Sequence, residues 1–182
     1  PLLMTLFQYG EFTVMDSHKA SLSLMAYGLG LLPFIFIKVL APGYYARQDT
    51  KTPVKIGIIA MISNMALNVV LMIYLDHVGL ALATALSAML NAGLLYHGLR
   101  KRSVYTPNSG WGKFSLKLVI ANSSLFVFLL LLNPQHNEWV IWDAWQRGGH
   151  LFGLIVGAAV TYFTFLLVLR INLKSLVRPI MR

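Results

Sequence analysis

Polar side chains at helical spacing stand inside two otherwise apolar stretches of the sequence. Residues spaced by three or four share one face of a helix. Their amide and hydroxyl oxygens are neutral, hard ligands that suit a cation such as sodium, and they also form hydrogen bonds between packed membrane helices. They predict either a polar cavity wall with a monovalent cation site or hydrogen bonds between helices. The candidates are Asn64 and Asn68 in the first stretch and Thr84, Ser87 and Asn91 in the second.

Patterns typical of catalysis or metal binding are missing from the sequence. The chain has no cysteine, no His-Glu-x-x-His, no Gly-x-Ser-x-Gly and no glycine-rich phosphate loop. The five histidines stand near the ends of apolar stretches and none has a partner at metal-ligand spacing. No charged residue lies deep inside a stretch, where proton relays place them. We therefore predict no catalytic residue, no metal, no resident cofactor and no enzymatic activity.

The elements that carry these side chains are predicted to be transmembrane helices. Hydrophobic residues make up 57% of the chain and charged residues 12%, against about 25% charged in soluble domains. Runs without charge are each about twenty residues long, enough to cross the hydrocarbon of a bilayer. The predicted fold is an all-α membrane bundle of about five spans, preceded by the end of a sixth helix at Pro1–Phe7 in a fragment of a longer protein. The five runs are Ala20–Ile37, Ile56–Leu75, Val78–Leu99, Leu118–Asn137 and Gly148–Leu169.

The distribution of charge predicts the orientation of the spans. Alternate loops hold all of the 15 Lys and Arg residues except Lys19 and Arg147, and Asp49 is the only acid among those basic loops. Cytoplasmic loops retain Lys and Arg, so the C-terminus is predicted to be cytoplasmic. The net charge of +9 then faces the anionic cytoplasmic leaflet. We predict no nucleic-acid partner, because no soluble basic face remains to bind one.

The first full span, about Ser21–Val39, contains Gly28, Gly30 and Pro33. Proline removes a backbone hydrogen bond and clashes with the preceding turn, so a bend is expected there. The bend serves either as a packing kink or as a hinge in a helix that must move.

A loop with a defined start and end should follow this span. Ala41–Gly43 is expected to stop the helix, and Thr52 is expected to cap the next helix, with Pro53 in its first position. The basic side chains of Arg47, Lys51 and Lys55 would face phosphates or the cytosol. The head-group or loop candidates are Arg47, Asp49 and Lys51.

The second and third spans are joined only by Asp76–Val78, so they should form a tight helical hairpin. A turn near His77 would place Asn68 level with Ser87 and Asn64 level with Asn91. Small alanines on the second helix would allow close approach.

Two further patterns lie near the end of the chain. Gly149, Gly153 and Gly157 form a stripe of small residues that serves either helix packing or a groove for a lipid tail. Trp139, Trp142 and Trp145 recur every three residues and predict one short amphipathic helix in the outer interface.

The segment Val39–Ile56, with Ala-Pro-Gly-Tyr-Tyr-Ala-Arg-Gln-Asp-Thr-Lys-Thr-Pro at its centre, resembles the cytoplasmic loop of the MurJ (MviN) family. Thr5–Phe12 and Leu90–Tyr96 resemble that family as well. These are flippases of the multidrug/oligosaccharidyl-lipid/polysaccharide exporter superfamily. The resemblance implies fourteen transmembrane helices in the bacterial inner membrane, arranged as two six-helix lobes and two extra helices that work by alternating access.

On that map, residues 1–112 would end the C-terminal lobe, and residues 113–182 would be the two extra helices and a basic tail. The implied partners are the undecaprenyl-pyrophosphate-linked peptidoglycan precursor lipid II, membrane lipids and the missing N-terminal half. The family also suggests a sodium coupling ion at Asn64, Asn68 and Thr84. Alternatives are a drug/cation antiporter or O-antigen-type flippase of the same superfamily, a membrane enzyme of envelope lipid synthesis, and a scaffold subunit.

Overall fold

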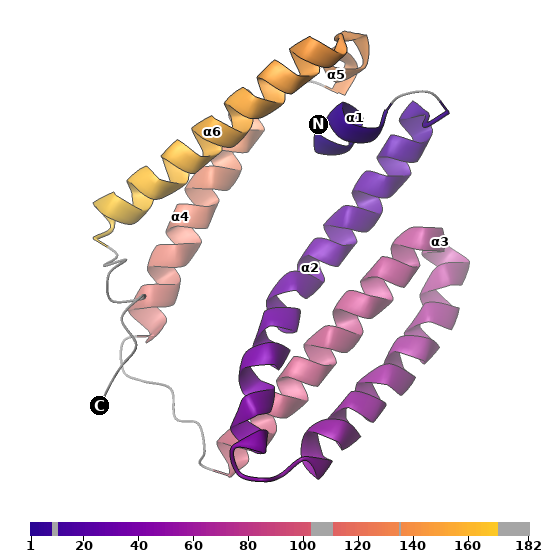
Figure 1. The fold of residues 1–182 in the computed structure, drawn as a ribbon, viewed down its shortest axis with the longest axis vertical. Coiled ribbons are helices and arrows are strands. Elements are labelled where there is room, and N and C mark those ends of the chain that lie inside the picture. The colour runs from indigo at the N-terminus through magenta and orange to yellow at the C-terminus, as the bar shows by residue number, and fades with distance from the viewer. Residues whose placement is uncertain (9–10, 103–110, 135, 171–182) are drawn as a thin grey trace. The chain divides into compact units, whose positions relative to one another are not determined.

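The computed structural model describes residues 1–8, 11–102, 111–134 and 136–170, and every regular element in this part is a helix (Figure 1). The predicted all-α class is therefore confirmed. Four helices are long and apolar enough to cross a membrane: α2, α3, α4 and α6. The helices in chain order are α1 (Leu2–Phe7), α2 (Val14–Tyr45), α3 (Lys51–Lys101), α4 (Trp111–Leu132), α5 (His136–Ile141) and α6 (Ala144–Val168).

The helices form two compact units. One unit contains α2 and α3, and the other contains α1, α4, α5 and α6.

The long helix α3 is a hairpin of two spans. Its backbone leaves the helical region at Asp76, where φ is 47° and ψ is −131°, and the arms on either side run antiparallel (Figure 1). Each arm has about 25 residues, or about 37 Å of helix, enough to cross the hydrocarbon. The arms touch closely beside the turn, where a Cβ at Gly79 would overlap the carbonyl group of Leu71. The hairpin accounts for the fifth predicted span.

Helix α2 is longer than the sequence predicted. It begins with a capping box, in which the Asp16 amide donates to Thr13 Oγ1 at 3.2 Å and the Thr13 amide donates to Asp16 Oδ2 at 3.0 Å. It continues through Pro42 to Tyr45, so the predicted stop at Ala41–Gly43 is wrong. Pro42 has no backbone N–H, so the last part of the helix lacks one hydrogen bond. The free energy gained by burying Tyr44, which is 1% exposed, offsets this loss.

The start of α3 also differs from the prediction. The helix begins at Lys51, and the Thr52 side chain does not cap it; instead the Thr52 amide donates to Asp49 Oδ1 at 3.0 Å. The Asp49 carboxylate is the stronger acceptor for the free amides of a helix start, which explains why it takes that place.

Helix α2 packs on α3 at two close approaches. A Cβ at Gly30 would lie 3.1 Å from Ala85 Cα, and a Cβ at Gly98 would overlap the Tyr44 hydroxyl. That hydroxyl donates to the Leu95 carbonyl at 2.8 Å. Small residues at both points let the backbones of α2 and α3 approach each other. The sequence had assigned the alanines of the second arm to the contact between the two arms of the hairpin, whereas Ala85 faces α2. The cluster around Tyr44 consists of Leu40, Tyr44, Ile56, Leu95 and Leu99.

The hinge candidates have different surroundings. Gly30 and Pro33 are buried, whereas Gly28 is exposed and a Cβ there would meet nothing within 4 Å. Packing thus restrains Gly30 and Pro33, whereas no neighbouring group among the described residues restrains Gly28.

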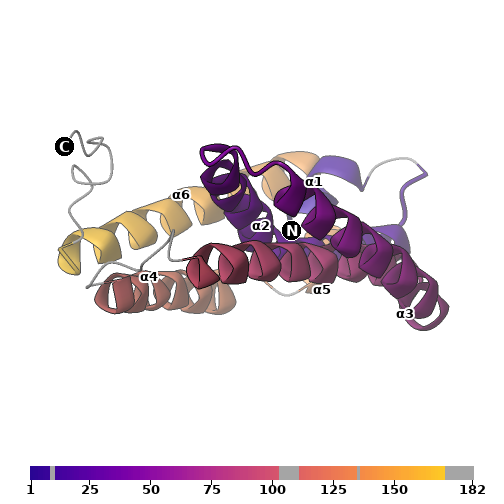
Figure 2. The ribbon, with the colours of Figure 1, turned by 90° about the horizontal axis from the view of Figure 1, so that it is seen from below.

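In the other unit, α4 and α6 lie side by side in both views (Figure 1 and Figure 2). Ala121 and Leu166 are buried between them, and Lys117 Nζ donates to the Leu169 carbonyl at 2.8 Å. At the opposite end of α6, the side chain of Arg147 is 7% exposed. Its guanidinium donates to the carbonyls of Met4 at 3.3 Å and Val140 at 3.0 Å, which ties α6 to α1 and α5.

The prediction of one amphipathic helix carrying three tryptophans is wrong. Helix α5 ends at Ile141, and Asp143 caps a new helix in a capping box with Gln146. Trp139 is 1% exposed and Trp145 is 91% exposed, so the tryptophans do not share a face. The Asp143 cap leaves Trp139 on α5, Trp145 on α6 and Trp142 between the two helices.

Replacing Gly98 by Ala tests the contact between α2 and α3. The new methyl group would displace the Tyr44 hydroxyl from the Leu95 carbonyl, and loss of a buried hydrogen bond costs about 1–3 kcal/mol. We expect the free energy of unfolding, measured for the full-length protein in detergent, to fall by that amount. Gly93→Ala in the same arm is the control, because a Cβ there meets nothing within 4 Å. Equal effects of the two changes would contradict the packing described.

Candidate functional site

A chain of hydrogen bonds crosses the middle of the α3 hairpin. The Asn68 amide donates to Asn64 Oδ1 at 3.0 Å, and the Asn64 amide donates to Ser87 Oγ at 3.2 Å. The Ser87 hydroxyl donates to the Thr84 carbonyl at 3.0 Å. The structure thus links the side chains of Asn64, Asn68 and Ser87 and reaches Thr84 through its backbone carbonyl. We refer to these four residues as the amide network.

The predicted register of the hairpin is wrong by one helical turn. Asn64 lies opposite Ser87 rather than Asn91, because the reversal takes place at Asp76 alone and leaves no three-residue connection. Asn91 is one turn further along and adds no link to the network.

Two oxygens of the amide network are able to accept a further hydrogen bond. Asn68 Oδ1 is buried and, within the described residues, accepts no hydrogen bond. The Thr84 hydroxyl donates back to the Leu80 carbonyl at 2.9 Å, which leaves its oxygen able to accept. The network therefore offers neutral oxygens to a hydrogen-bond donor or a small cation.

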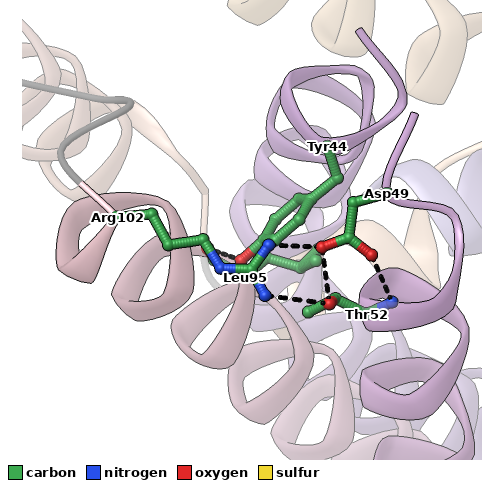
Figure 3. Close-up of polar contacts among 5 residues, drawn as sticks. All are labelled: Tyr44, Asp49, Thr52, Leu95 and Arg102. Carbon is green, nitrogen blue, oxygen red and sulfur yellow. Dashed lines mark hydrogen bonds and ion pairs between the residues drawn. The ribbon is translucent and has the colours of Figure 1, made fainter. Parts of the chain in front are cut away.

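A second polar cluster closes the end of the same unit that the charge pattern predicts to be cytoplasmic (Figure 3). Asp49 Oδ2 accepts from the Thr52 hydroxyl at 2.7 Å and from Arg102 Nη1. Arg102 Nη2 donates to Thr52 Oγ1 at 3.2 Å, and the guanidinium carbon lies 5.8 Å from the centre of the Tyr44 ring. This clamp, made by Tyr44, Asp49, Thr52 and Arg102, joins the start of α3 to its end and to the last turn of α2.

The clamp changes the acidity of its carboxyl group. The hydrogen bond from the Thr52 hydroxyl, and after it the bond from Arg102, lower the pKa of Asp49 to about 2. Both donors favour the charged form.

Of the three predicted loop residues, only Asp49 enters the clamp. Arg47 and Lys51 are exposed. Arg102 was missed, although the sequence holds a clue: Asp49 is the only acid among the basic loops, so one of those cations must be its partner.

The glycine stripe has two different environments. A Cβ at Gly157 would lie 2.6 Å from Phe128 Cζ, whereas Gly149 and Gly153 have nothing within 4 Å. The latter two line an open groove of about 500 Å³ on the α4–α6 unit. Gly157 thus lies in a packed contact, whereas Gly149 and Gly153 line the groove. The other residues that line the groove are Phe128, Leu132, Pro134, Gln146, His150 and Leu154.

The rim of the groove carries a polar group that the sequence did not single out. The His150 ring stacks on Trp142 with 4.0 Å between centroids, and its Nδ1 lies 2.9 Å from the Gln146 carbonyl. The tryptophan spacing gave no hint of this pairing.

Comparison with known proteins points to one family. The family model described as lipid II flippase MurJ matches residues 1–147. A probable lipid II flippase MurJ of Vibrio cholerae is 48% identical over 178 residues, covering 97% of this chain and 34% of the relative. A probable lipid II flippase MurJ of Haemophilus influenzae is 48% identical over 172 residues, covering 94% and 34%. The chain spans about a third of the length of these relatives.

The pKa of Asp49 predicts how the clamp responds to acid. A lowered pKa contributes stability above the unfolded value of 3.8, and this contribution is lost as the pH falls toward about 2. We expect Asp49→Asn to be less stable than the wild type at neutral pH, with a difference that shrinks between about pH 4 and pH 2. Chemical unfolding across this range measures it.

Arg102→Gln is the matched control for this pH dependence. It removes one of the three hydrogen-bond donors to the Asp49 carboxylate. The pKa of Asp49 should then be lowered less, so the loss of stability on acidification should be complete at a higher pH than in the wild type. A difference between wild type and Asp49→Asn that stays constant down to pH 2 would contradict the assignment.

Proposed function

Because this chain belongs to the lipid II flippase MurJ family, we propose that it forms the C-terminal membrane part of a flippase for lipid II. The cargo is the peptidoglycan precursor linked to undecaprenyl pyrophosphate, and the protein spans the bacterial inner membrane several times. The observation that carries the proposal is the family match over residues 1–147, supported by helices long and apolar enough for membrane spans.

Such a transporter must carry a large charged head group past hydrocarbon while the prenyl tail stays in lipid. A polar cavity between two lobes lowers the cost of burying the head group. Residues 1–112 would complete the C-terminal lobe, and residues 113–182 would add the two extra helices. The missing N-terminal half would supply the other wall of the cavity. In this chain the amide network and Asn91 would line the wall.

The close contacts of α2 with α3 suggest how this lobe moves. Gly30 at Ala85 and Tyr44 at Leu95 hold the two helices together. We place the hinge at Gly28, Gly30 and Pro33. The backbone torsion angles would change at Gly28, while Gly30 and Pro33 stay packed. The exposed Arg47 and Lys51 would then meet the head-group phosphates before the lobes close.

Sodium would fit the amide network only as a weakly held ion. Asn64, Asn68 and Thr84 offer neutral oxygens, and Asn68 Oδ1 is the acceptor without a partner in the described residues. A bound sodium ion would add a positive charge to the cavity wall. Since none of the four network residues is an acid, charge balance would have to come from elsewhere in the protein.

Complementation with the full-length gene tests the proposed function. In a host depleted of its lipid II flippase, we expect the wild type to restore growth and Asn64→Leu and Asn68→Leu to fail at normal protein levels. Arg47→Ala should rescue partially. The control is Asn122→Leu, the same change at an exposed residue of α4 whose amide bonds only to the Leu118 carbonyl. A well-expressed wild type that does not rescue would favour another exporter of the superfamily.

The groove on α4 and α6 would hold the prenyl tail of the cargo during transport. Gly153→Leu fills open space, so it should slow lipid II flipping in vesicles while leaving the free energy of unfolding unchanged. Gly157→Ala meets Phe128 and should lower that free energy by about 1–3 kcal/mol through overpacking. Gly148→Leu, outside the groove lining, is the control. A Gly153→Leu protein that flips at the wild-type rate would exclude this role.

A further inference from the structure

Three basic side chains gather at the end of the second arm of α3. His97, Arg100 and Lys101 are spaced by three and four residues, so they share one face of the helix. All three are exposed, and they line an open pocket of about 520 Å³. Neither the amide network nor the clamp uses them.

The length of the arm fixes the depth of this pocket. About 25 residues between Asp76 and Lys101 give about 37 Å of helix, whereas the hydrocarbon is about 30 Å thick. The Asp49–Arg102 ion pair, one residue beyond Lys101, requires contact with water or head groups. The pocket therefore lies at the level of the cytoplasmic head groups.

The charge of the pocket is not balanced by a nearby acid. The sequence contains no Asp or Glu between Asp76 and Glu138. Among the described residues of the cytoplasmic side, the only carboxylate is that of Asp49, and Arg102 and Thr52 already occupy it. Arg102 is thereby held at the clamp, while the positive charge of Arg100 and Lys101 remains available to an external anion.

We propose that His97, Arg100 and Lys101 form a binding site for the phosphate head group of an anionic phospholipid in the cytoplasmic leaflet. Arg and Lys bind phosphate oxygens strongly, and that leaflet concentrates anionic lipids. Among the described residues, the pocket lining offers cations and no amide or hydroxyl side chain that would recognise sugars or peptides. This chemistry fits a simple phosphodiester better than the head group of the proposed cargo. The inference goes beyond the proposed flippase function and does not depend on it.

The test uses the full-length protein in nanodiscs of phosphatidylcholine with and without phosphatidylglycerol. Native mass spectrometry measures the apparent Kd of the first retained phosphatidylglycerol. Since each cation near the surface contributes about a fivefold preference, Arg100→Gln combined with Lys101→Gln should weaken binding about 20- to 30-fold. The matched control is Lys38→Gln with Lys55→Gln, which removes the same charge from exposed residues outside the pocket. Equal weakening in both double variants would overturn the proposal.

The clamp provides a test with the opposite sign. Asp49→Asn releases Arg102, which should tighten phosphatidylglycerol binding about fivefold. Arg102→Gln in the wild-type background leaves the Asp49 carboxylate without this cation, so it should weaken binding by no more than about fivefold. A loss of binding in Arg102→Gln as large as in the pocket variant would contradict the assignment of the site to the other three residues.

Two further arms separate the phospholipid from other phosphates. Inorganic phosphate at millimolar concentration should not displace phosphatidylglycerol; displacement would identify a site for soluble phosphate instead. The pocket variant should flip lipid II normally in pure phosphatidylcholine vesicles. A pocket variant with slow flipping there and unchanged phosphatidylglycerol binding would show a cargo site and refute the proposal.

Discussion

The hydrocarbon core of a membrane offers no hydrogen-bond partner, so a spanning chain must satisfy its polar groups internally. In the described helices this constraint decides where each polar side chain binds. Asn122 and Thr84 donate to carbonyls one turn earlier in their own helices. Ser87 also donates to a carbonyl of its own helix, that of Thr84. The Asn68 amide donates to Asn64 one turn earlier in the same arm, and the Asn64 amide donates to Ser87 across the α3 hairpin. The amide network is thus a consequence of the solvent as much as a candidate site.

The same constraint acts differently on charges at the two ends of the spans. At the end predicted to be cytoplasmic, Asp49 and Arg102 form an ion pair beside exposed basic residues, where water is available. Arg147, assigned to the outer side by its charge pattern, is buried instead and donates to backbone carbonyls of α1 and α5. These hydrogen bonds compensate for the burial of the charge, and they connect α6 to α1 and α5.

The sequence predicted the spans and the polar faces because both depend on local periodicity and on charge-free length. It failed where a few tertiary contacts decide the outcome. The hairpin reverses at one residue, Asp76, whereas the sequence predicted a connection of three residues. The predicted pairing therefore placed Asn64 opposite Asn91 instead of Ser87. Burial of Tyr44 carried α2 past Pro42, and the Asp143 cap separated tryptophans whose spacing suggested one helix. Arg102 could have been inferred only by asking which cation neutralises Asp49, a question of pairing across about fifty residues of chain.

The two arms of the α3 hairpin are held together at both ends, and a buried acceptor lies between these contacts. The clamp joins the two arms at the cytoplasmic end, and the close approach of Gly79 to Leu71 joins them at the turn. Between these points, Asn68 Oδ1 is buried without a donor among the described residues. A buried acceptor in that condition costs about 1–3 kcal/mol, and a ligand that donates to it recovers this free energy without moving either end. Because the side chain of Asn68 is a neutral amide, the gain is that of a neutral hydrogen bond or a weak cation contact. In the proposed function, a ligand would therefore bind at the centre of the hairpin while the two ends hold the register that positions the binding atoms.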